Sequence, residues 1–307
     1  MTAKGFGSEM VDALNGQFGV HTGCPAIHAK GTWSQGTFVA NGALARLTTA
    51  PQLAGGTHTV VSRLSNGDGR PDSPDGEAFS LGFAVSFLGD GIPISDLMMV
   101  DSETFITNDP DEFLGFSKSN ATTQTGQANV LKSGTFAAVH PKLTAAAIRK
   151  QRAPIAASYA SQKWHAVHAY LLVDADENQK PVRFSWVPVA GESYLSRDEA
   201  KKLPPNYLGD DMKSRLETDP IEFDLEVTLA DDSDTLIDST IVWPNNRARI
   251  VAGRLTLDTW LESYSPHRFV PNRYGEGIRP SSDPLIMART WTYQESYRRR
   301  KSEAYDE

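Results

Sequence analysis

The sequence contains a single cysteine, Cys24, among its 307 residues, so no disulfide can form within the chain. One cysteine is typical of a reducing compartment, and we therefore expect a cytoplasmic protein. Long hydrophobic runs are also missing, since no stretch approaches the roughly 18 apolar residues of a membrane-spanning helix. The first residues carry charges and glycines where a signal peptide needs an apolar core. These absences predict neither a membrane span nor a membrane partner.

Positive charge is in the minority, with 30 lysines and arginines against 38 acidic residues and a net charge of -8. Phosphate backbones are repelled by such a balance, so we expect no nucleic-acid partner. The basic run at 298–301 is better explained as the cationic last turn of a helix. Internal repeats and low-complexity tracts are absent, which argues against a solenoid. A hydrophobic share of 39% allows a large core, and we expect one domain over residues 1–307.

Short alternating segments, separated by clusters of Asn, Asp, Gly and Pro, fill the middle of the chain. Many such segments predict an antiparallel barrel or sandwich. The expected strands are 36–38, 58–64, 79–88, 164–173, 182–188, 221–229 and 254–257. Helical patterns occupy 1–18, 110–118, 142–161, 197–202 and 285–301. Before the last of these, Asp283 can cap the helix and Pro284 can begin it.

Three sequence features that resemble metal-binding or catalytic sites have simpler structural explanations. The acidic and glycine-rich stretch 65–77 lacks the ligand spacing of a calcium loop, so an ordinary turn is expected. His165 and His168 form a poor zinc pair, because odd spacing along the expected strand places them on opposite faces. Cys24 has no orienting partner in the sequence, which favours a small buried residue over a nucleophile.

Two segments can carry chemistry. His28 enters a glycine-punctuated segment, although a lone histidine beside Ile27 is more often a core residue than a catalyst. Arg289 and Tyr293 are four residues apart on the expected last helix and share one face. A guanidinium beside a phenol favours the ionised phenolate, whose ordinary pKa is about 10, and a phenolate is a strong ligand for ferric iron. Alone, this pair is better explained as a surface cation and aromatic contact on an ordinary helix.

Both segments belong to a series of motifs that resembles the catalase family. The series follows the family's order from about Phe18 to Arg300. It comprises HAKG at 28–31, SRLSNGDG at 62–69, GFAVSF at 82–87, WHAVHAYLLVDADE at 164–177, VWP at 242–244, AGRLTL at 252–257 and GIRPSSDPLIMARTWTYQESYRRR at 277–300. The resemblance implies an α+β fold, with an antiparallel β-barrel of the catalase type, surrounding helices, an N-terminal helical extension at 1–20 and a C-terminal haem-binding helix at 283–303.

The same resemblance implies a haem b cofactor and assigns roles around it. His28 would be the distal acid and base, Ser65 its hydrogen-bonding partner, and Tyr293 the proximal iron ligand. Arg289 would keep the tyrosine ionised. The remaining expected cofactor contacts are Arg63 and Arg300 at the propionates, Phe113 on the distal face of the porphyrin and His168 on the proximal side.

Two positions depart from the family pattern. Val100 stands where catalases keep an asparagine, and valine cannot hydrogen-bond a peroxide. Pro25 replaces a further arginine expected at a propionate. We therefore expect a peroxidase that reduces hydrogen peroxide or organic hydroperoxides through an iron-oxo intermediate, with weak catalase activity and an unidentified electron donor. A more open pocket is expected, and a homodimer or a monomer is as plausible as a tetramer.

Two other functions stay open at this point. Relatives of catalase such as allene oxide synthases rearrange fatty-acid hydroperoxides and resemble this chain around the distal histidine. Ile27, which is bulky and has no hydroxyl, is more similar to the valine of catalases than to the polar residue of those synthases. The second alternative is a lipocalin-like barrel that binds a small hydrophobic ligand without catalysis. This alternative gives Arg289 and Tyr293 no role.

Overall fold

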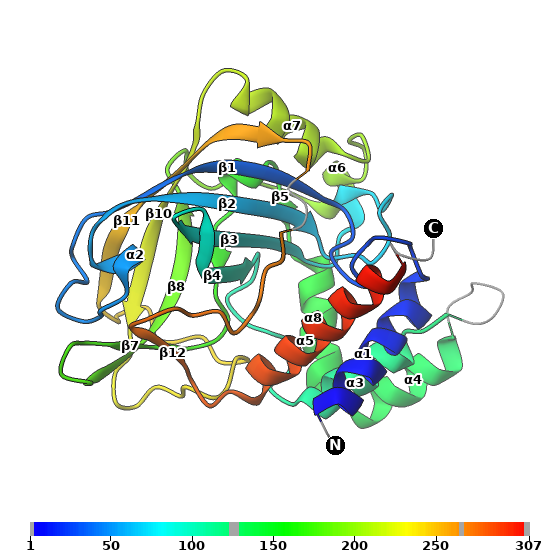
Figure 1. The fold of residues 1–307 in the computed structure, drawn as a ribbon. Helices are drawn as coiled ribbons and strands as arrows, with labels where there is room; N and C mark the ends of the chain where they lie inside the picture. The colour runs from blue at the N-terminus through cyan, green and yellow to red at the C-terminus, as the bar shows by residue number, and fades with distance from the viewer. Residues whose placement is uncertain (1–2, 123–128, 264–266, 304–307) are drawn as a thin grey trace.

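The computed structural model describes residues 3–122, 129–263 and 267–303. Its main feature is an antiparallel β-barrel, in which β8 pairs with β6 on one side and with β10 on the other and so closes the sheet (Figure 1). In spatial order the barrel strands are β10 (Ile221–Leu229), β11 (Arg249–Leu261), β1 (Gly31–Ala40), β2 (Gly56–Asn66), β3 (Leu81–Gly89), β4 (Ile92–Val100), β6 (Trp164–His165) and β8 (Gln179–Pro188).

Four shorter strands lie outside this closed ring. β7 (Tyr170–Val173) pairs with β8, and β12 (Ile278–Pro280) adds to the free edge of β7. β5 (Ile155–Ala156) and β9 (Tyr194–Leu195) form a separate two-stranded sheet. With the helices, this architecture confirms the predicted α+β fold with an antiparallel barrel.

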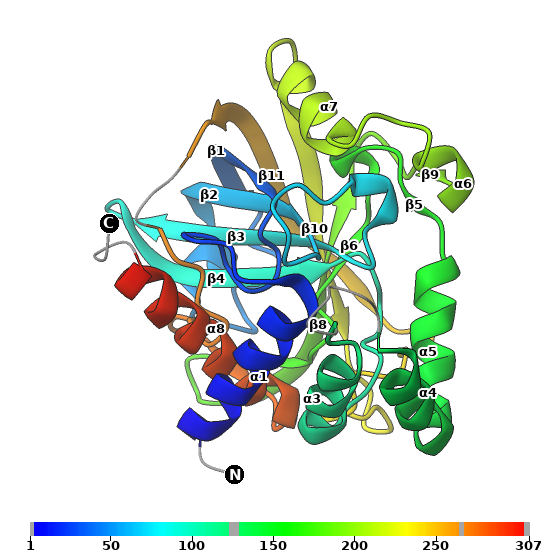
Figure 2. The ribbon, with the colours of Figure 1, turned by 90° about the vertical axis from the view of Figure 1, so that its right-hand side faces the viewer.

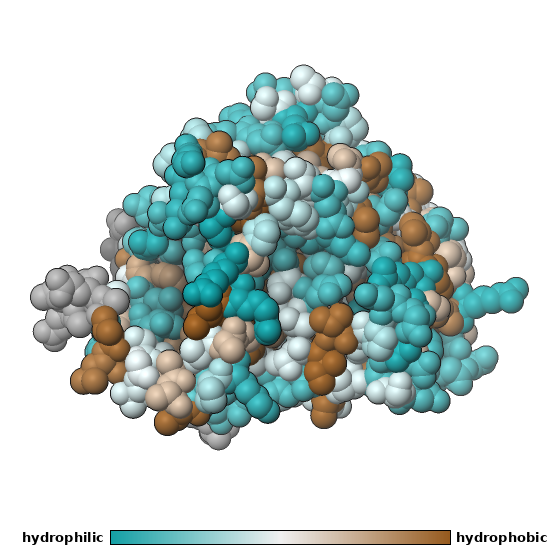
Figure 3. Space-filling model, turned by 180° about the vertical axis from the view of Figure 1, so that it is seen from behind, coloured by the Kyte–Doolittle hydropathy of each residue, from teal (hydrophilic) through white to brown (hydrophobic). Residues whose placement is uncertain are grey.

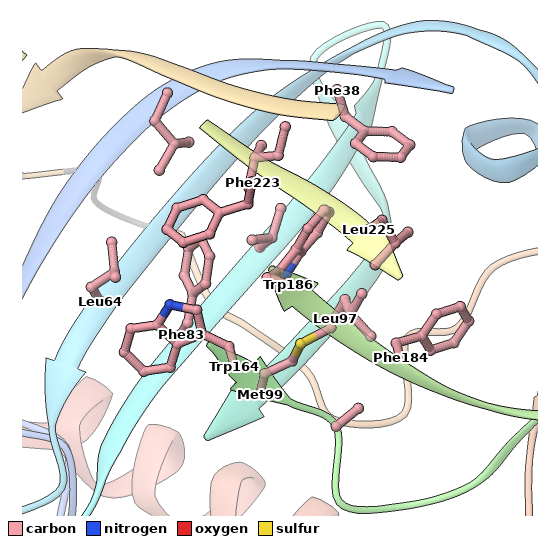
Figure 4. Packing of buried hydrophobic residues seen from close by; sticks show 14 of the residues in the cluster. Phe38, Leu64, Phe83, Leu97, Met99, Trp164, Phe184, Trp186, Phe223 and Leu225 are labelled. Carbon is pink, nitrogen blue, oxygen red and sulfur yellow. The ribbon is translucent and has the colours of Figure 1, made fainter. Parts of the chain in front are cut away.

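Large aromatic side chains fill the interior of the barrel (Figure 4). They alternate along the strands with residues that face outward, as the period of a strand requires. Phe83 packs against Trp164 at 5.4 Å between ring centroids and against Phe223 at 5.3 Å, while Phe38 contacts Trp186 at 5.7 Å. The barrel is therefore a packed core. The interior of the barrel has no room for the ligand that the lipocalin-like alternative requires.

Five helices gather beside one end of the barrel, where Figures 1 and 2 show α1 and α8 side by side. These five are α1 (Ala3–Phe18), α3 (Pro110–Ser119), α4 (Val130–Val139), α5 (Pro141–Arg152) and α8 (Pro284–Glu303). Short elements elsewhere are α2 (Pro51–Ala54), α6 (Arg197–Ala200), α7 (Tyr207–Leu216) and the 3₁₀ turns η1 (Asp75–Glu77) and η2 (Tyr159–Ser161). The largest cavity described below lies between the helical group and the barrel.

α1 and α8 run parallel and touch closely. Phe6 meets Trp291 edge to face at 6.0 Å, and one guanidinium nitrogen of Arg299 lies 2.7 Å from a carboxylate oxygen of Asp12. A Cβ atom at Gly7 would stand only 2.6 Å from the backbone oxygen of Trp291. Glycine is therefore required at this position for the two backbones to approach.

Several of the predicted elements are wrong in extent. The strands expected over 36–38 and 254–257, for example, are parts of the longer β1 and β11. The helix expected over 142–161 ends at Arg152, because Pro154 disfavours helical backbone at the residue before it. The strand expected over 164–173 is interrupted at residues 166–169 and becomes β6 and β7. α4 and α7 were not anticipated from the sequence patterns. Within the described residues, the structure contains no helix of the length and apolar character needed to cross a bilayer.

Candidate active site

A cavity of about 1080 Å³ lies where the helical group meets the strand ends, and it brings the predicted residues of the two chemical segments together. His28 and Val100 line it from the barrel side, Phe113 from α3, and Arg289 and Tyr293 from α8. Its volume is at the upper end of the range of pockets that bind cofactors and other small molecules, about 300 to 1000 Å³. The same walls include many apolar side chains of α1, α3, α4 and α5.

His28 is held at one end of β1 by its neighbours on the next two strands. Its Nδ1 lies 3.0 Å from Oγ of Ser65 in β2, and its backbone adopts a left-handed φ of 59°. Gly82 in β3 lies directly beneath this pair, where a Cβ atom would approach Cε1 of the imidazole to 2.9 Å and Oγ of the serine to 3.0 Å. Gly82 is the first residue of the GFAVSF motif, but its steric role beside His28 was not predicted.

The register of the barrel aligns these positions across neighbouring strands. Gly31 is opposite Ser65, Ser65 is opposite Gly82, and Gly82 is opposite Val100. Val100 is in turn opposite His165 of β6, which also lines the cavity. One row of paired residues across the sheet therefore lies along this wall of the cavity. The strand register sets the positions of these residues relative to one another.

The surroundings of His28 keep its imidazole neutral. Desolvation by the surrounding protein, followed by the positive charges of Arg63 and Arg289, lowers the pKa of His28 from 6.5 to about 4. The hydroxyl of Ser65 can donate to the carbonyl of Gly82 at 3.4 Å and accept from Nδ1–H of the histidine. This arrangement favours the tautomer in which Nε2 carries the lone pair, so that the ring can take up a proton at Nε2.

α8 positions Arg289 and Tyr293 on the face that lines the cavity. The helix begins at Pro284, as expected, and Oδ1 of Asp283 accepts a hydrogen bond from the backbone N–H of Leu285 at 2.9 Å. The backbone N–H of Ala26 donates to Oγ of Ser296 at 3.1 Å, which ties the segment before His28 to the same helix. Residues far apart in sequence thus face one space.

His168 lies behind Arg289 rather than in the large cavity. Its Nδ1 is 2.7 Å from Oδ2 of Asp283, and the buried Nε2 has no hydrogen-bond partner in the described part of the chain. Both His168 and Arg289 line a second, much smaller space. Burial lowers the pKa of this imidazole, and the hydrogen bond to Asp283 opposes the shift. His165 lies in β6 and lines the large cavity, whereas His168 lies in the segment after β6 and is buried. The two histidines therefore occupy different environments.

Arg63 lies within electrostatic range of both Arg300 and Tyr293. The half-buried guanidinium of Arg63 extends over Gly31, donates to the carbonyl of Ala29 at 3.0 Å and forms no ion pair with a carboxylate that the structure describes. Desolvation lowers the pKa of Arg63 to about 10; the charge of Arg300 also lowers this pKa, and Tyr293 raises it. A cation placed here without an acidic partner suits an anionic group of a ligand.

These observations test whether the residues fit a haem. The cavity is large enough, an imidazole and a phenol line it, and two guanidinium groups stand near the phenol. Aromatic side chains complete one wall, where Phe113 meets Phe105 edge to face at 5.0 Å. The donor set is therefore compatible with a flat, apolar, dianionic ring system whose metal binds a tyrosine.

Other residues of the cavity wall were missed by the sequence reasoning. Nζ of Lys150 in α5 lies 2.7 Å from Oδ2 of Asp101, and this well-shielded ion pair lines the cavity just beyond Val100. Phe136 of α4 lines the opposite part of the wall. No local pattern indicates these contacts, because they depend on how α4 and α5 fold back over the barrel end.

The chain is similar in sequence to known proteins. A family model described as Catalase matches residues 25–307. A catalase-related peroxidase of Mycolicibacterium paratuberculosis is 33% identical, over 95% of this chain and 94% of that protein. A second catalase-related peroxidase, from Synechococcus elongatus, is 27% identical over 95% of this chain and 88% of its own length.

Solved structures show the same fold at low sequence identity. A fungal catalase superposes with a TM-score of 0.80 at 19% identity and covers 94% of this chain. Catalase A from Saccharomyces cerevisiae gives 0.79 at 19% identity over 91% of the chain. The chain spans 61% and 62% of the lengths of those two structures.

Proposed function

The chain belongs to the catalase family, and on that premise we propose that it is a haem peroxidase that reduces hydrogen peroxide or organic hydroperoxides, with weak catalase activity. Family homologues are haem enzymes, and we propose haem b as the cofactor. The observation that carries the proposal is that His28, hydrogen-bonded to Ser65, and Tyr293 line one cavity.

In this proposal each site residue holds or positions part of the cofactor. Tyr293 would bind the iron, and Arg289 one turn earlier would favour the phenolate. Arg63 and Arg300 would pair with the propionates. Phe113 would pack on the distal face of the ring, and His168 would hold its place on the proximal side through Asp283. When bound, the haem would supply the redox chemistry of peroxide reduction, and an outside donor would supply the electrons.

The proton steps belong to His28. Nε2 of the neutral imidazole takes the proton from one peroxide oxygen and delivers it to the other, so that the second oxygen leaves as water or as an alcohol. Ser65 orients the ring through Nδ1, and Gly82 leaves the space that the ring needs. Val100 offers no hydrogen bond to a second peroxide molecule, which supports a peroxidase that depends on an outside electron donor more than a catalase.

The visible spectrum tests this function. We expect the purified protein to be brown-green with an intense Soret band, and Tyr293→Phe to lose or shift that band. Tyr297→Phe, one turn later on α8, is the matched control because Tyr297 packs between Arg268 and Arg300. A protein that stays colourless after reconstitution with haemin, or an unchanged spectrum in Tyr293→Phe, would contradict the proposal.

Product analysis separates reduction from rearrangement. With a lipid hydroperoxide and a reducing donor, the proposed peroxidase gives an alcohol, whereas an allene oxide synthase-like activity gives an epoxide. Ile27, which lines the cavity without a hydroxyl, supports reduction. A stopped-flow assay checks the weak catalase activity. Full oxygen-releasing turnover without any donor would overturn that part of the proposal.

We further propose that the protein works in the cytoplasm as a homodimer or a monomer. The single cysteine supports a reducing compartment. Light scattering of the haem-loaded protein measures its mass in solution, and a tetramer would contradict this assembly.

A further inference from the structure

The α4–α5 hairpin combines features that the peroxidase chemistry does not require. In a chain with a net charge of -8, the segment 113–173 contains no aspartate or glutamate. Its charged residues are Lys118, Lys132, Lys142, Arg149, Lys150, Arg152 and Lys163. Most of these cations belong to α4 and α5. The hairpin is therefore strongly positive within an acidic protein.

The same hairpin exposes apolar side chains. None of the residues of α4 is buried, and Val130, Leu131 and Val139 are 76%, 82% and 68% exposed. Ile148 of α5 adds another exposed aliphatic side chain. On the face that Figure 3 shows, patches of brown, apolar surface lie among teal, polar residues. Exposed apolar side chains concentrated on one element indicate a binding surface more than an ordinary solvent-facing helix.

α4 is attached to the rest of the protein through its C-terminal part. Phe136 stacks on His140 with ring centroids 4.1 Å apart and packs against Phe116 of α3 at 6.3 Å. Nδ1 of His140 lies 2.8 Å from a carboxylate oxygen of Glu112, so this acidic group is engaged at the base of the hairpin. The N-terminal turn of α4, with Val130 and Leu131, points away from these contacts, as its exposure shows.

The cations of the hairpin remain available to a partner. Lys150 is held by Asp101. By contrast, Lys132, Lys142 and Arg152 are exposed and form no ion pair with a described carboxylate. Exposed aliphatic side chains next to lysine and arginine are the pattern of helices that lie on an anionic lipid surface. A symmetric contact with a second copy would instead bring like charges together.

We propose that the α4–α5 hairpin docks on a bilayer with anionic headgroups. Val130 and Leu131, in the exposed N-terminal turn of α4, would enter the interface while Lys132, Lys142 and Arg152 meet the headgroups. The absence of long apolar runs argues against a membrane span and does not bear on a helical turn that enters only the interface. The proposal differs from the expectation of no membrane partner, and the vesicle experiment below decides between them.

The hairpin also forms part of the wall of the candidate active site. Phe136 and Ala137 of α4, and Ala147, Ile148 and Arg149 of α5, line the large cavity. A hydroperoxide carried by a lipid could pass from the interface along this apolar wall toward His28. This use of the surface, with lipid hydroperoxides as the substrate class, rests on the proposed peroxidase function, whereas the docking itself does not.

Vesicle binding tests the docking directly. The haem-loaded protein is centrifuged with vesicles of phosphatidylcholine alone, or of phosphatidylcholine and phosphatidylglycerol in equal amounts. We expect binding to the anionic vesicles that weakens as salt is added. The variant Val130→Ser/Leu131→Ser should bind about tenfold or more weakly. The triple reversal Lys132→Glu/Lys142→Glu/Arg152→Glu should lose at least roughly fivefold for each cation.

Matched controls come from other exposed sites. Ile92→Ser removes an aliphatic side chain that is 67% exposed on β4, and Lys201→Glu/Lys202→Glu reverses two exposed charges beside α6. Both controls should bind the anionic vesicles as well as the unmodified protein does. Unchanged thermal midpoints and Soret bands show that the variants are folded.

Three outcomes would overturn the proposal. The first is absence of binding to anionic vesicles at low salt. The second is a dimer, seen by light scattering, that Val130→Ser/Leu131→Ser converts to a monomer while vesicles do not bind, because a second copy then covers the surface. The third is equal binding of a DNA oligonucleotide with no effect of the apolar substitutions.

Kinetics separate the docking from the proposed chemistry. With phospholipid hydroperoxide in anionic vesicles, the hairpin variants should raise KM about tenfold, while kcat/KM for hydrogen peroxide stays unchanged. Vesicle binding without any peroxide reduction would contradict the proposed function and leave the docking intact. Equal KM values for the hairpin variants and the unmodified protein would contradict the link between the surface and the substrate.

Discussion

Oδ2 of Asp283 lies 2.7 Å from Nδ1 of His168, while Oδ1 of the same carboxylate accepts the backbone N–H of Leu285 at 2.9 Å. One side chain therefore begins α8 and fixes the buried histidine behind Arg289. The start of the helix that carries Tyr293 is tied in this way to the segment between β6 and β7.

Substitution of Asp283 should separate its two roles. Asp283→Ala removes a helix cap and leaves Nδ1 of buried His168 without an acceptor, so we expect a loss of about 2 to 4 kcal/mol in the free energy of unfolding. Asp283→Asn keeps an oxygen for the Leu285 N–H and should lose less than half as much. Urea denaturation measures both variants, and equal losses would contradict the dual role.

The activity should depend on pH through His28. Because the pKa of His28 is lowered from 6.5 to about 4, the imidazole is neutral above that value and competent as a base. We expect the second-order rate constant with hydrogen peroxide to stay level as the pH falls past 6.5 and to drop only as it passes about 4. Stopped-flow measurement on the haem-loaded enzyme over this range is the test.

His28→Gln is the control for that profile. It should keep the haem spectrum and lose about 10² to 10⁴ in the rate constant, because proton transfer is removed while the cofactor contacts remain. A profile that falls with an apparent pKa near 6.5 would contradict the desolvated environment of the ring.

Gly82→Ala should disturb the distal pair without unfolding the protein. Its Cβ atom would press on Cε1 of His28 at 2.9 Å and on Oγ of Ser65 at 3.0 Å, so the ring must move. A displacement of this kind near the reacting atoms costs about 10²-fold in rate. The rate constant with hydrogen peroxide is the measurement, with haem content recorded alongside it.

Gly134→Ala is the matched comparison for that variant. Nothing lies within 4 Å of the added methyl group in exposed α4, so this change should leave the rate unaltered and stabilise the protein by about 0.5 to 1 kcal/mol. If both glycine variants lowered the rate equally, steric pressure on His28 would not be the cause.

Val100→Asn should raise the catalase activity. An amide on this wall supplies the hydrogen bond that valine lacks and can orient a second peroxide near His28. We expect oxygen release per haem to rise about tenfold or more, since one well-placed donor is worth that much or more in enzymes. Val100→Ala enlarges the space without adding a donor, and an equal rise in that variant would show that access alone limits the reaction.

The local patterns predicted much of the fold. Asp283 and Pro284 marked the beginning of α8, and the alternation of apolar residues over 221–229 matched β10 to its ends. The interruption at residues 166–169 was missed because Ala166, Val167 and Ala169 are apolar like the strands on either side. It nevertheless separates the cavity-lining His165 from the buried His168.

The site was predicted in part, for a physical reason. Motifs along the chain indicate the residues that carry chemistry, such as His28 and Tyr293. They do not indicate the residues that leave space for these side chains or that line the rest of the cavity. Gly82 matters only because β3 pairs with β2 beside Ser65. Lys150 reaches Asp101 only because α5 folds back over the end of the barrel. Such contacts arise from tertiary structure.

The parallel contact between α1 and α8 bears on how the protein is made. α1 leaves the ribosome early, yet the helix that covers Phe6, Met10 and Leu14 is synthesised after the whole barrel. During translation these apolar side chains therefore lack their contacts with α8. At this stage nascent chains are prone to aggregate and are bound by chaperones. The large cavity thus takes its final form only after synthesis of α8. A nascent chain that stalls before that point lacks Arg289 and Tyr293 and has no complete site for the proposed cofactor.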